Sequence, residues 1–152
     1  MAHVARSRDA NESPEAAEAI KGILSPGMAV LASVTARVSS IGDNGIGGWI
    51  DYRSSKAATN QVVKTLDHEL RRSAASGNSA GKGPGAIAVS LHPGTVAGTN
   101  LSKDFTNTDD IGKKDGVFSA PQATGHLLDV IKSLDAESGG RFLDYAGKEI
   151  PW

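Results

Sequence analysis

The stretch "DYRSSKAATNQVVKTLDHELRR" (residues 51–72) lies between two apolar runs and has the periodicity of a helix. Val62, Leu66 and Leu70 recur every four residues, which places them on one helix face. Asp51 stands where a capping side chain is expected. We therefore predict a helix over residues 51–72.

Two short apolar runs flank this helix. "MAVLASV" (28–34) precedes it across a glycine- and serine-rich loop, residues 37–50, and "AIAVSL" (86–91) follows it after a flexible connection. Runs of this length bounded by turn residues are typical of buried strands. The remaining predicted elements are a helix over residues 14–24, a helix over residues 121–134 and a last strand within "GGRFLDYAG" (139–147).

The order of these elements predicts the fold class. Strands that alternate with helices form a parallel sheet with right-handed crossovers, so we expect an α/β domain over residues 13–152, preceded by an irregular tail over residues 1–12. Ligands of open α/β sheets bind beyond the carboxyl ends of the strands. The segments 37–50 and 97–120 leave from that edge, and the second is long and polar, as a lid over a site would be.

Composition excludes several classes of function. Of 152 residues, 39% are apolar and 22% are charged, as in ordinary globular proteins, and the net charge of −1 argues against binding to nucleic acid or anionic membranes. The chain has no cysteine, which excludes disulfides and cysteine-bound metals and fits the cytoplasm. His92 and His126 lack ligand spacing, so we expect no metal.

Tyr52 and Lys56 stand four residues apart at the start of the predicted helix, so both project from one face. A free tyrosine, with a pKa near ~10, is a poor acid–base catalyst at neutral pH, but a nearby ammonium lowers that pKa. The pair can therefore exchange a proton with a reacting oxygen. On spacing alone, a surface tyrosine packed on a lysine stem is the alternative.

Longer motifs surround the pair: "SSIGDNGIGGWIDYRSSKAATNQ" (39–61), "HPGTV" (92–96) and "GRFLDYAGKEIPW" (140–152). Together they resemble the short-chain dehydrogenase/reductase family, and within it the C-factor/sniffer-like carbonyl reductases. The resemblance runs from about Met28 to Trp152. It implies a partial Rossmann-type fold, the C-terminal half of a doubly wound parallel sheet.

The resemblance implies roles for the pair. Tyr52 would be the general acid for carbonyl reduction, and Lys56 would lower its pKa and bind the nicotinamide ribose. The cofactor would be NAD or NADP, the substrate a small carbonyl or alcohol, and the protein a homo-oligomer joined through the tyrosine helix. The implied cofactor-binding residues are Tyr52, Lys56, Pro93, Gly94, Thr95, Val96 and Thr99.

A serine that orients the carbonyl and a relay asparagine complete the implied site. The usual spacing leads to Ser39, thirteen residues before the tyrosine, and Ser40 adjoins it. Counting from the end of the strand leads instead to Ala36, preceded by Thr35. Only a hydroxyl can donate to the carbonyl oxygen, so Ser39 and Ser40 are the candidates. Asn11 is the candidate for the asparagine.

The cofactor end departs from the family pattern. Family members open with a strand, a glycine-rich turn and a helix whose N-terminus receives the pyrophosphate. The glycine cluster "GKGPG" (81–85) precedes a strand instead of following one, so we interpret it as a linker. Two hypotheses follow: an NAD(P)-dependent oxidoreductase acting on a small carbonyl or alcohol, or a truncated, catalytically silent fragment that binds or signals.

Overall fold

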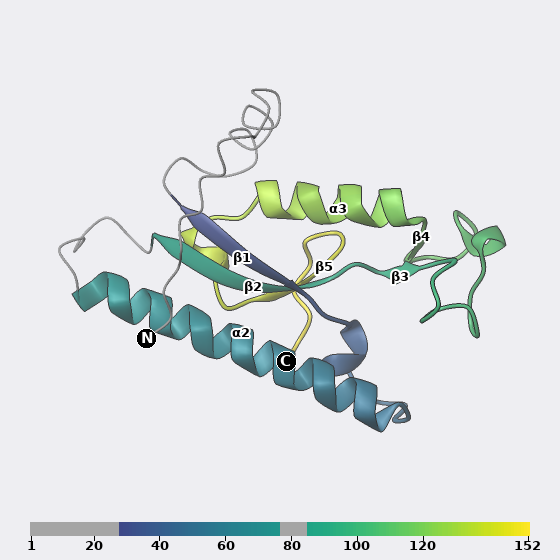
Figure 1. The fold of residues 1–152 in the computed structure, drawn as a ribbon, viewed down its shortest axis with the longest axis horizontal. Coiled ribbons are helices and arrows are strands. Elements are labelled where there is room, and N and C mark those ends of the chain that lie inside the picture. Colours follow the sequence, from purple (N-terminus) through teal and green to yellow (C-terminus); the bar gives the residue numbers. More distant parts are fainter. Residues whose placement is uncertain (1–27, 77–84) are drawn as a thin grey trace.

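The computed structural model describes residues 28–76 and 85–152 (Figure 1). Within them, three strands form one parallel sheet in the order β1-β2-β5. Strand β1 pairs with β2 from Ala29 opposite Ala86 to Val34 opposite Leu91. The sheet confirms the predicted α/β class. The strands are β1 (Ala29–Val34), β2 (Ala86–His92) and β5 (Phe142–Asp144).

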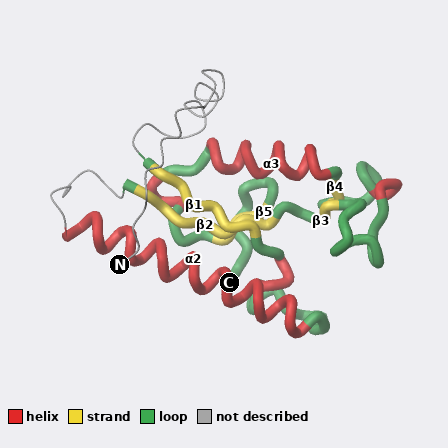
Figure 2. Tube along the Cα trace, in the orientation of Figure 1, coloured by secondary structure: helices red, strands yellow, loops and turns green. Residues whose placement is uncertain are grey.

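Two helices, α2 (Ile50–Ser76) and α3 (Ala120–Lys132), lie on opposite faces of the sheet (Figures 1 and 2). The alternation of side chains along β2 explains this arrangement. Ile87, Val89 and Leu91 belong to one buried cluster with residues of α3. The intervening residue Ala88 instead donates its backbone N–H to a carboxylate of α2. A central strand covered on both faces is characteristic of a doubly wound sheet.

Strand β1 differs from its prediction. The sequence predicted a buried strand, but Leu31 is 48% exposed and Val34 is 53% exposed. The reason is position, because β1 lies at the edge of the sheet formed by the described residues and β2 lies at its centre. The prediction of burial is therefore wrong for β1 and confirmed for β2, whose residues 87–91 are all buried.

The helix boundaries also differ in detail. Helix α2 begins at Ile50, so Asp51 lies in its first turn instead of capping it, and the helix continues to Ser76. Helix α3 has a capping box in which Ser119 and Gln122 bond to each other's backbone. None of the described helices is long and apolar enough to cross a membrane. The predicted tail (1–12), the predicted helix (14–24), Asn11 and residues 81–84 of the glycine cluster lie outside the described residues.

The polar segment after β2 is more ordered than predicted. Short strands β3 (Thr95–Val96) and β4 (Val117–Phe118) pair in parallel and close it at its base. Gly94, with φ of +78°, makes this closure possible, because a Cβ there would lie 2.7 Å from the Phe118 ring. The intervening residues 97–116 thus form a loop whose two ends are fixed at the carboxyl end of β2. Three 3-10 turns complete the fold: Arg37–Ser39, Thr108–Asp110 and Ala136–Ser138.

Candidate active site

Tyr52 and Lys56 lie one turn apart at the start of α2, beside the carboxyl end of β1. The Lys56 Nζ is 5.9 Å from the centre of the Tyr52 ring and donates a long hydrogen bond, 3.4 Å, to the carbonyl of Val34. The structure thus places the two side chains together, as their spacing predicted. The end of a parallel strand is also where open α/β sheets bind ligands.

Tyr52 differs from its prediction in one respect. Burial raises the pKa of Tyr52 above its ordinary value of 10.0. The expectation that Lys56 lowers this pKa is wrong for the structure, because the loss of water around the phenol dominates. The hydroxyl of Tyr52 is protonated at neutral pH with or without this shift, and the shift makes it a weaker acid.

The hydroxyls of the two candidate serines are both engaged in hydrogen bonds within the protein. The Ser39 Oγ donates to the carbonyl of Ala36 (2.6 Å) and accepts from the Asn60 Nδ2 (2.7 Å). The Ser40 Oγ donates to the carbonyl of Pro151 and accepts a backbone N–H. Within the described part of the chain, neither hydroxyl bonds to the tyrosine. Their proposed role toward a carbonyl therefore stays a prediction.

Counting from the end of β1 instead leads to Ala36 and Thr35 as the residues in the position of the serine. Ala36 is buried there and offers only a methyl group, so it cannot orient a carbonyl. Thr35 is also buried, and its Oγ1 lies 3.5 Å from the carbonyl of Lys56 and 3.4 Å from the Ser39 Oγ. Thr35 therefore links the strand end to the helical turn that carries the lysine. The hydroxyls of Thr35 and Ser39 thus belong to one hydrogen-bonded network.

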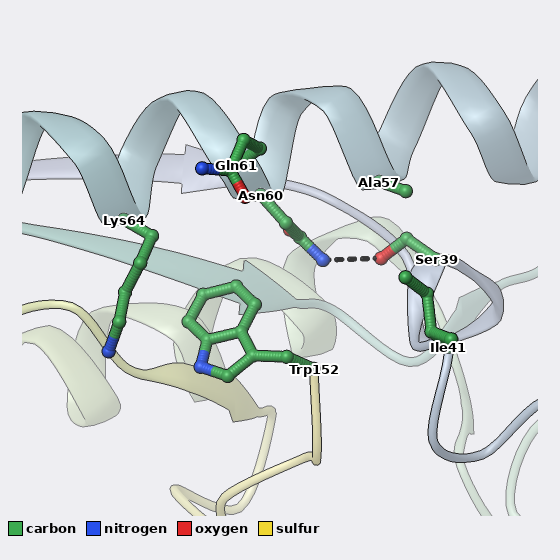
Figure 3. A pocket seen from close by; sticks show the side chains of 7 residues that line it. All are labelled: Ser39, Ile41, Ala57, Asn60, Gln61, Lys64 and Trp152. Atoms are coloured by element: carbon green, nitrogen blue, oxygen red, sulfur yellow. Dashed lines mark hydrogen bonds between the residues drawn. The ribbon is translucent and has the colours of Figure 1, made fainter.

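Asn60 is a polar residue of this network that sequence reasoning missed. The residue is 4% exposed, and its Nδ2 points to Ser39 while its Oδ1 has no hydrogen-bond partner among residues 28–76 and 85–152 (Figure 3). The signal was present, because Asn60 stands three residues before buried Val63 on the sheet-facing side of α2. A cavity of about 110 Å³ adjoins it, lined by Ser39, Ile41, Ala57, Asn60, Gln61, Lys64 and Trp152.

The "HPGTV" turn begins at the carboxyl end of β2, where His92 lies opposite Asp144 of β5. Burial, with a smaller effect from the positive charge of Arg37, lowers the pKa of His92 to about 4, although Asp144 opposes the shift. The His92 Nδ1 is buried without a hydrogen-bond partner. The candidate cofactor residues Pro93, Gly94, Thr95 and Val96 are half-buried, whereas Thr99 is exposed and donates its hydroxyl to the carbonyl of Val96.

His92 should make the stability of the fold depend on pH. Because the folded state favours neutral His92, the unfolded state binds more protons below pH 6.5, and stability should fall as the pH drops from about 6.5 towards about 4. The loss attributable to His92 should reach about 3 kcal/mol at most. Urea unfolding at several pH values measures it. His92→Gln should flatten the slope in this range, and an unchanged slope would contradict the assignment.

The residues available to a cofactor fit only one of its ends. The Lys56 ammonium has three donors and uses one in a long bond, so it can bond to ribose hydroxyls. Within residues 28–76 and 85–152, the glycine-rich connection from a strand to a helix is the long loop 37–50 between β1 and α2, which is not the tight strand–turn–helix that receives a pyrophosphate. In the same residues, no group of three or more histidines or carboxylates could hold a metal ion.

Curated proteins are similar to this chain along most of its length. The protein named C-signal from Myxococcus xanthus is 36% identical over 122 residues, 80% of this chain and 60% of the relative. A 1-hydroxy-2-glutathionyl-2-methyl-3-butene dehydrogenase from Rhodococcus sp. (strain AD45) is 36% identical over 135 residues, 89% of this chain and 51% of the relative. The chain thus spans little more than half of each, and it matches their C-terminal part. No protein-family model matches it.

Solved structures have the same fold over the matched part. The NADPH-bound carbonyl reductase from chicken fatty liver has a TM-score of 0.64 at 23% identity, with 83% of this chain and 45% of that one covered. The carbonyl reductase Sniffer of D. melanogaster has a TM-score of 0.62 at 26% identity, with 81% of this chain and 41% of that one covered. The fold is therefore the C-terminal portion of a Rossmann-type sheet, as predicted.

Proposed function

The chain belongs to the short-chain dehydrogenase/reductase family, as its motifs predicted, and from this premise we propose that it supplies the proton-donating half of a nicotinamide-dependent carbonyl reductase. The observation that carries the proposal is the Tyr52–Lys56 pair at the carboxyl end of β1, with the Lys56 Nζ 5.9 Å from the centre of the Tyr52 ring. Dehydrogenase and carbonyl reductase are the names of three of the four similar proteins described above. They favour this function over a catalytically silent fragment.

The proposed mechanism assigns each side chain one task. When bound, the nicotinamide supplies a hydride to the carbonyl carbon. Tyr52, whose phenol is protonated at neutral pH, donates the proton that the carbonyl oxygen then requires. Lys56 holds the ribose with its free donors. Ser39 or Ser40 orients the carbonyl once its loop bond is exchanged for one to substrate.

The two directions of the reaction use different forms of Tyr52. Reduction uses the protonated phenol, whereas oxidation of an alcohol uses the phenolate as a base. Because burial disfavours the phenolate of Tyr52, oxidation should require a higher pH than reduction. The substrate we propose is a small carbonyl compound.

The first test concerns the cofactor. We expect this chain alone to bind NADH and NADPH poorly, because its described residues offer the ribose a lysine but offer the pyrophosphate no tight glycine-rich turn from a strand into a helix. Titration of either nucleotide, followed by its fluorescence, measures the affinity. Saturable binding at micromolar concentrations would contradict the expectation. Comparing the two nucleotides would also reveal any preference for the phosphorylated form.

The decisive test of the function requires the complementary half. The chain would be co-expressed with the N-terminal part of the Rhodococcus relative, the part that it does not match, and assayed for NADPH- or NADH-dependent loss of a small aldehyde or ketone. Turnover by the pair, absent from either part alone, supports the proposal. A complex that binds nucleotide but reduces none of the carbonyls contradicts it.

We also propose that two copies of the chain associate through helix α2. Helix α2 exposes Val62 (65%) and leaves Leu66 and Leu70 half-buried, so part of its apolar surface is available to a second copy. The free edge of β1 in the described sheet adds to this surface. Light scattering at tens of micromolar should detect a dimer that Val62→Asp weakens. A monomer at that concentration would count against the proposal.

A further inference from the structure

The loop before α2 ends in a strained residue. Trp49 has a φ of +47°, in the left-handed region that residues with bulky side chains rarely adopt. It is the one non-glycine residue with positive φ in the described part of the chain, and it follows Gly47 and Gly48, which share that conformation. Such strain persists only where the surroundings impose it, and it concentrates at ligand sites.

Arg53 imposes this conformation. Its guanidinium donates to the carbonyls of Val38 (2.8 Å), Gly47 (2.9 Å) and Gly48 (2.9 Å), and its Cζ lies 5.9 Å from the centre of the Trp49 ring. The loop is therefore fixed to the first turn of α2. Because each nitrogen of this guanidinium is bonded to a backbone carbonyl, Arg53 is poorly placed to recognise an anionic substrate group.

Trp49 meets an aromatic residue from the other loop of the site. The rings of Trp49 and Phe105 have centroids 6.0 Å apart at an angle of 40°. Both nevertheless stay exposed, Trp49 at 61% and Phe105 at 54%, and Leu101 (63%) and Ile50 (77%) are exposed as well. The two loops follow β1 and β2 from the edge where open α/β sheets bind ligands. An exposed aromatic pair at this edge, with one member held in a strained conformation, is typical of a site for an apolar ligand.

We infer that Trp49 and Phe105 form an aromatic wall that binds the ring of a carbonyl or alcohol substrate, with the oxygen towards Tyr52. The inference rests on the proposed function and names its substrate class: neutral compounds that carry an aromatic or alicyclic ring beside the reacting carbon. Tyr52 lies about one helical turn after Trp49, so one small molecule can reach both. Tilted aromatic rings favour a flat apolar partner over a methyl group.

Binding to this chain, without cofactor, tests the inference. The chain has two tryptophans, Trp49 and Trp152. The Trp152→Phe variant therefore has Trp49 as its single tryptophan, and its fluorescence reports on the proposed site. Titration with 1-phenylethanol should change the emission of Trp49 saturably, whereas 2-propanol should not. Phe105→Ala in this background should weaken binding by about three- to ten-fold. Leu128→Ala, which truncates an exposed apolar residue of α3 on the opposite face of the sheet from α2, is the matched control and should change nothing.

A second variant separates binding from folding. Trp49→Gly removes the ring and relieves the positive φ, so the thermal midpoint should stay the same or rise while ligand-detected NMR loses the 1-phenylethanol signal. A lower midpoint would mean that Trp49 serves packing, and would overturn the inference. So would equal responses to both alcohols or no saturable response. Failure of hydride transfer in the complemented enzyme would instead contradict the proposed function and leave this binding result standing.

Discussion

Tyr52→Phe should lower the turnover of the complemented enzyme by ~10²–10⁴, the usual contribution of a positioned acid. The substitution keeps the ring, and with it the packing at the start of α2, but removes the only proton that the side chain can donate. Hydride addition leaves negative charge on the carbonyl oxygen. Without the tyrosine, that oxygen can take its proton only from water. Turnover at saturating cofactor and substrate is the measurement, since it excludes weaker binding as the cause.

Two further variants give this result its meaning. Lys56→Met should lower turnover and also weaken cofactor binding, because the lysine is proposed to hold the ribose. Ser39→Ala and Ser40→Ala, made separately, should show which hydroxyl orients the carbonyl. Activity of Tyr52→Phe within a few-fold of the parent would remove Tyr52 from the mechanism. The pair would then be an ordinary tyrosine packed near a lysine stem.

The pH profile offers an independent check of the same residue. Because burial raises the pKa of Tyr52, reduction should proceed unchanged through neutral pH and decline only in strong alkali, where the phenol ionises. Oxidation of the alcohol should increase with pH over the same range. Both trends should disappear in Tyr52→Phe.

Periodicity and element order were sufficient to predict the α/β fold. The helix over 51–72 was visible because its apolar residues repeat every four positions, and the parallel sheet followed from strands that alternate with helices. The exposure of β1 could not be predicted in the same way, because "MAVLASV" is apolar whether or not another strand covers its edge. The burial of a strand depends on the elements that pack beside it, and these cannot be identified from the sequence of the strand itself.

The candidate site shows the same division. The spacing of Tyr52 and Lys56 was enough to place them on one helix face, but the direction of the pKa shift depends on how much water the phenol loses. The partners of Ser39 could not be found from local sequence, since Asn60 reaches it from 21 positions away. Two glycines before Trp49 hinted at unusual backbone, yet only the bonds of Arg53 explain the conformation.

Asp67 is the buried charge on which the position of α2 depends. Its side chain is 3% exposed, and its Oδ2 accepts from the Arg71 Nε at 2.7 Å. Its Oδ1 accepts the backbone N–H of Ala88 in β2 at 3.2 Å. Arg71 in turn donates to the carbonyl of Ala136 at 2.6 Å. One carboxylate therefore connects the helix, the central strand and the turn before β5.

Asp67→Ala should lower the free energy of unfolding by about 3–5 kcal/mol, the cost of removing one partner of a buried ion pair. The loss would leave the buried Ala88 N–H without its side-chain acceptor and would remove the carboxylate that faces the Arg71 guanidinium. Asp67→Asn should cost less, because an amide oxygen can still accept from Ala88. Asp129→Ala is the matched control. Asp129 also pairs with a residue of its own helix, Lys132, but its side chain is 76% exposed, so we expect the free energy of unfolding to fall by about 0.5 kcal/mol or less.

Urea unfolding of the chain measures all three. If Asp67→Ala and Asp129→Ala lower the free energy of unfolding equally, burial does not strengthen the Asp67–Arg71 pair. Helix α2 is then held on the sheet by its apolar contacts alone.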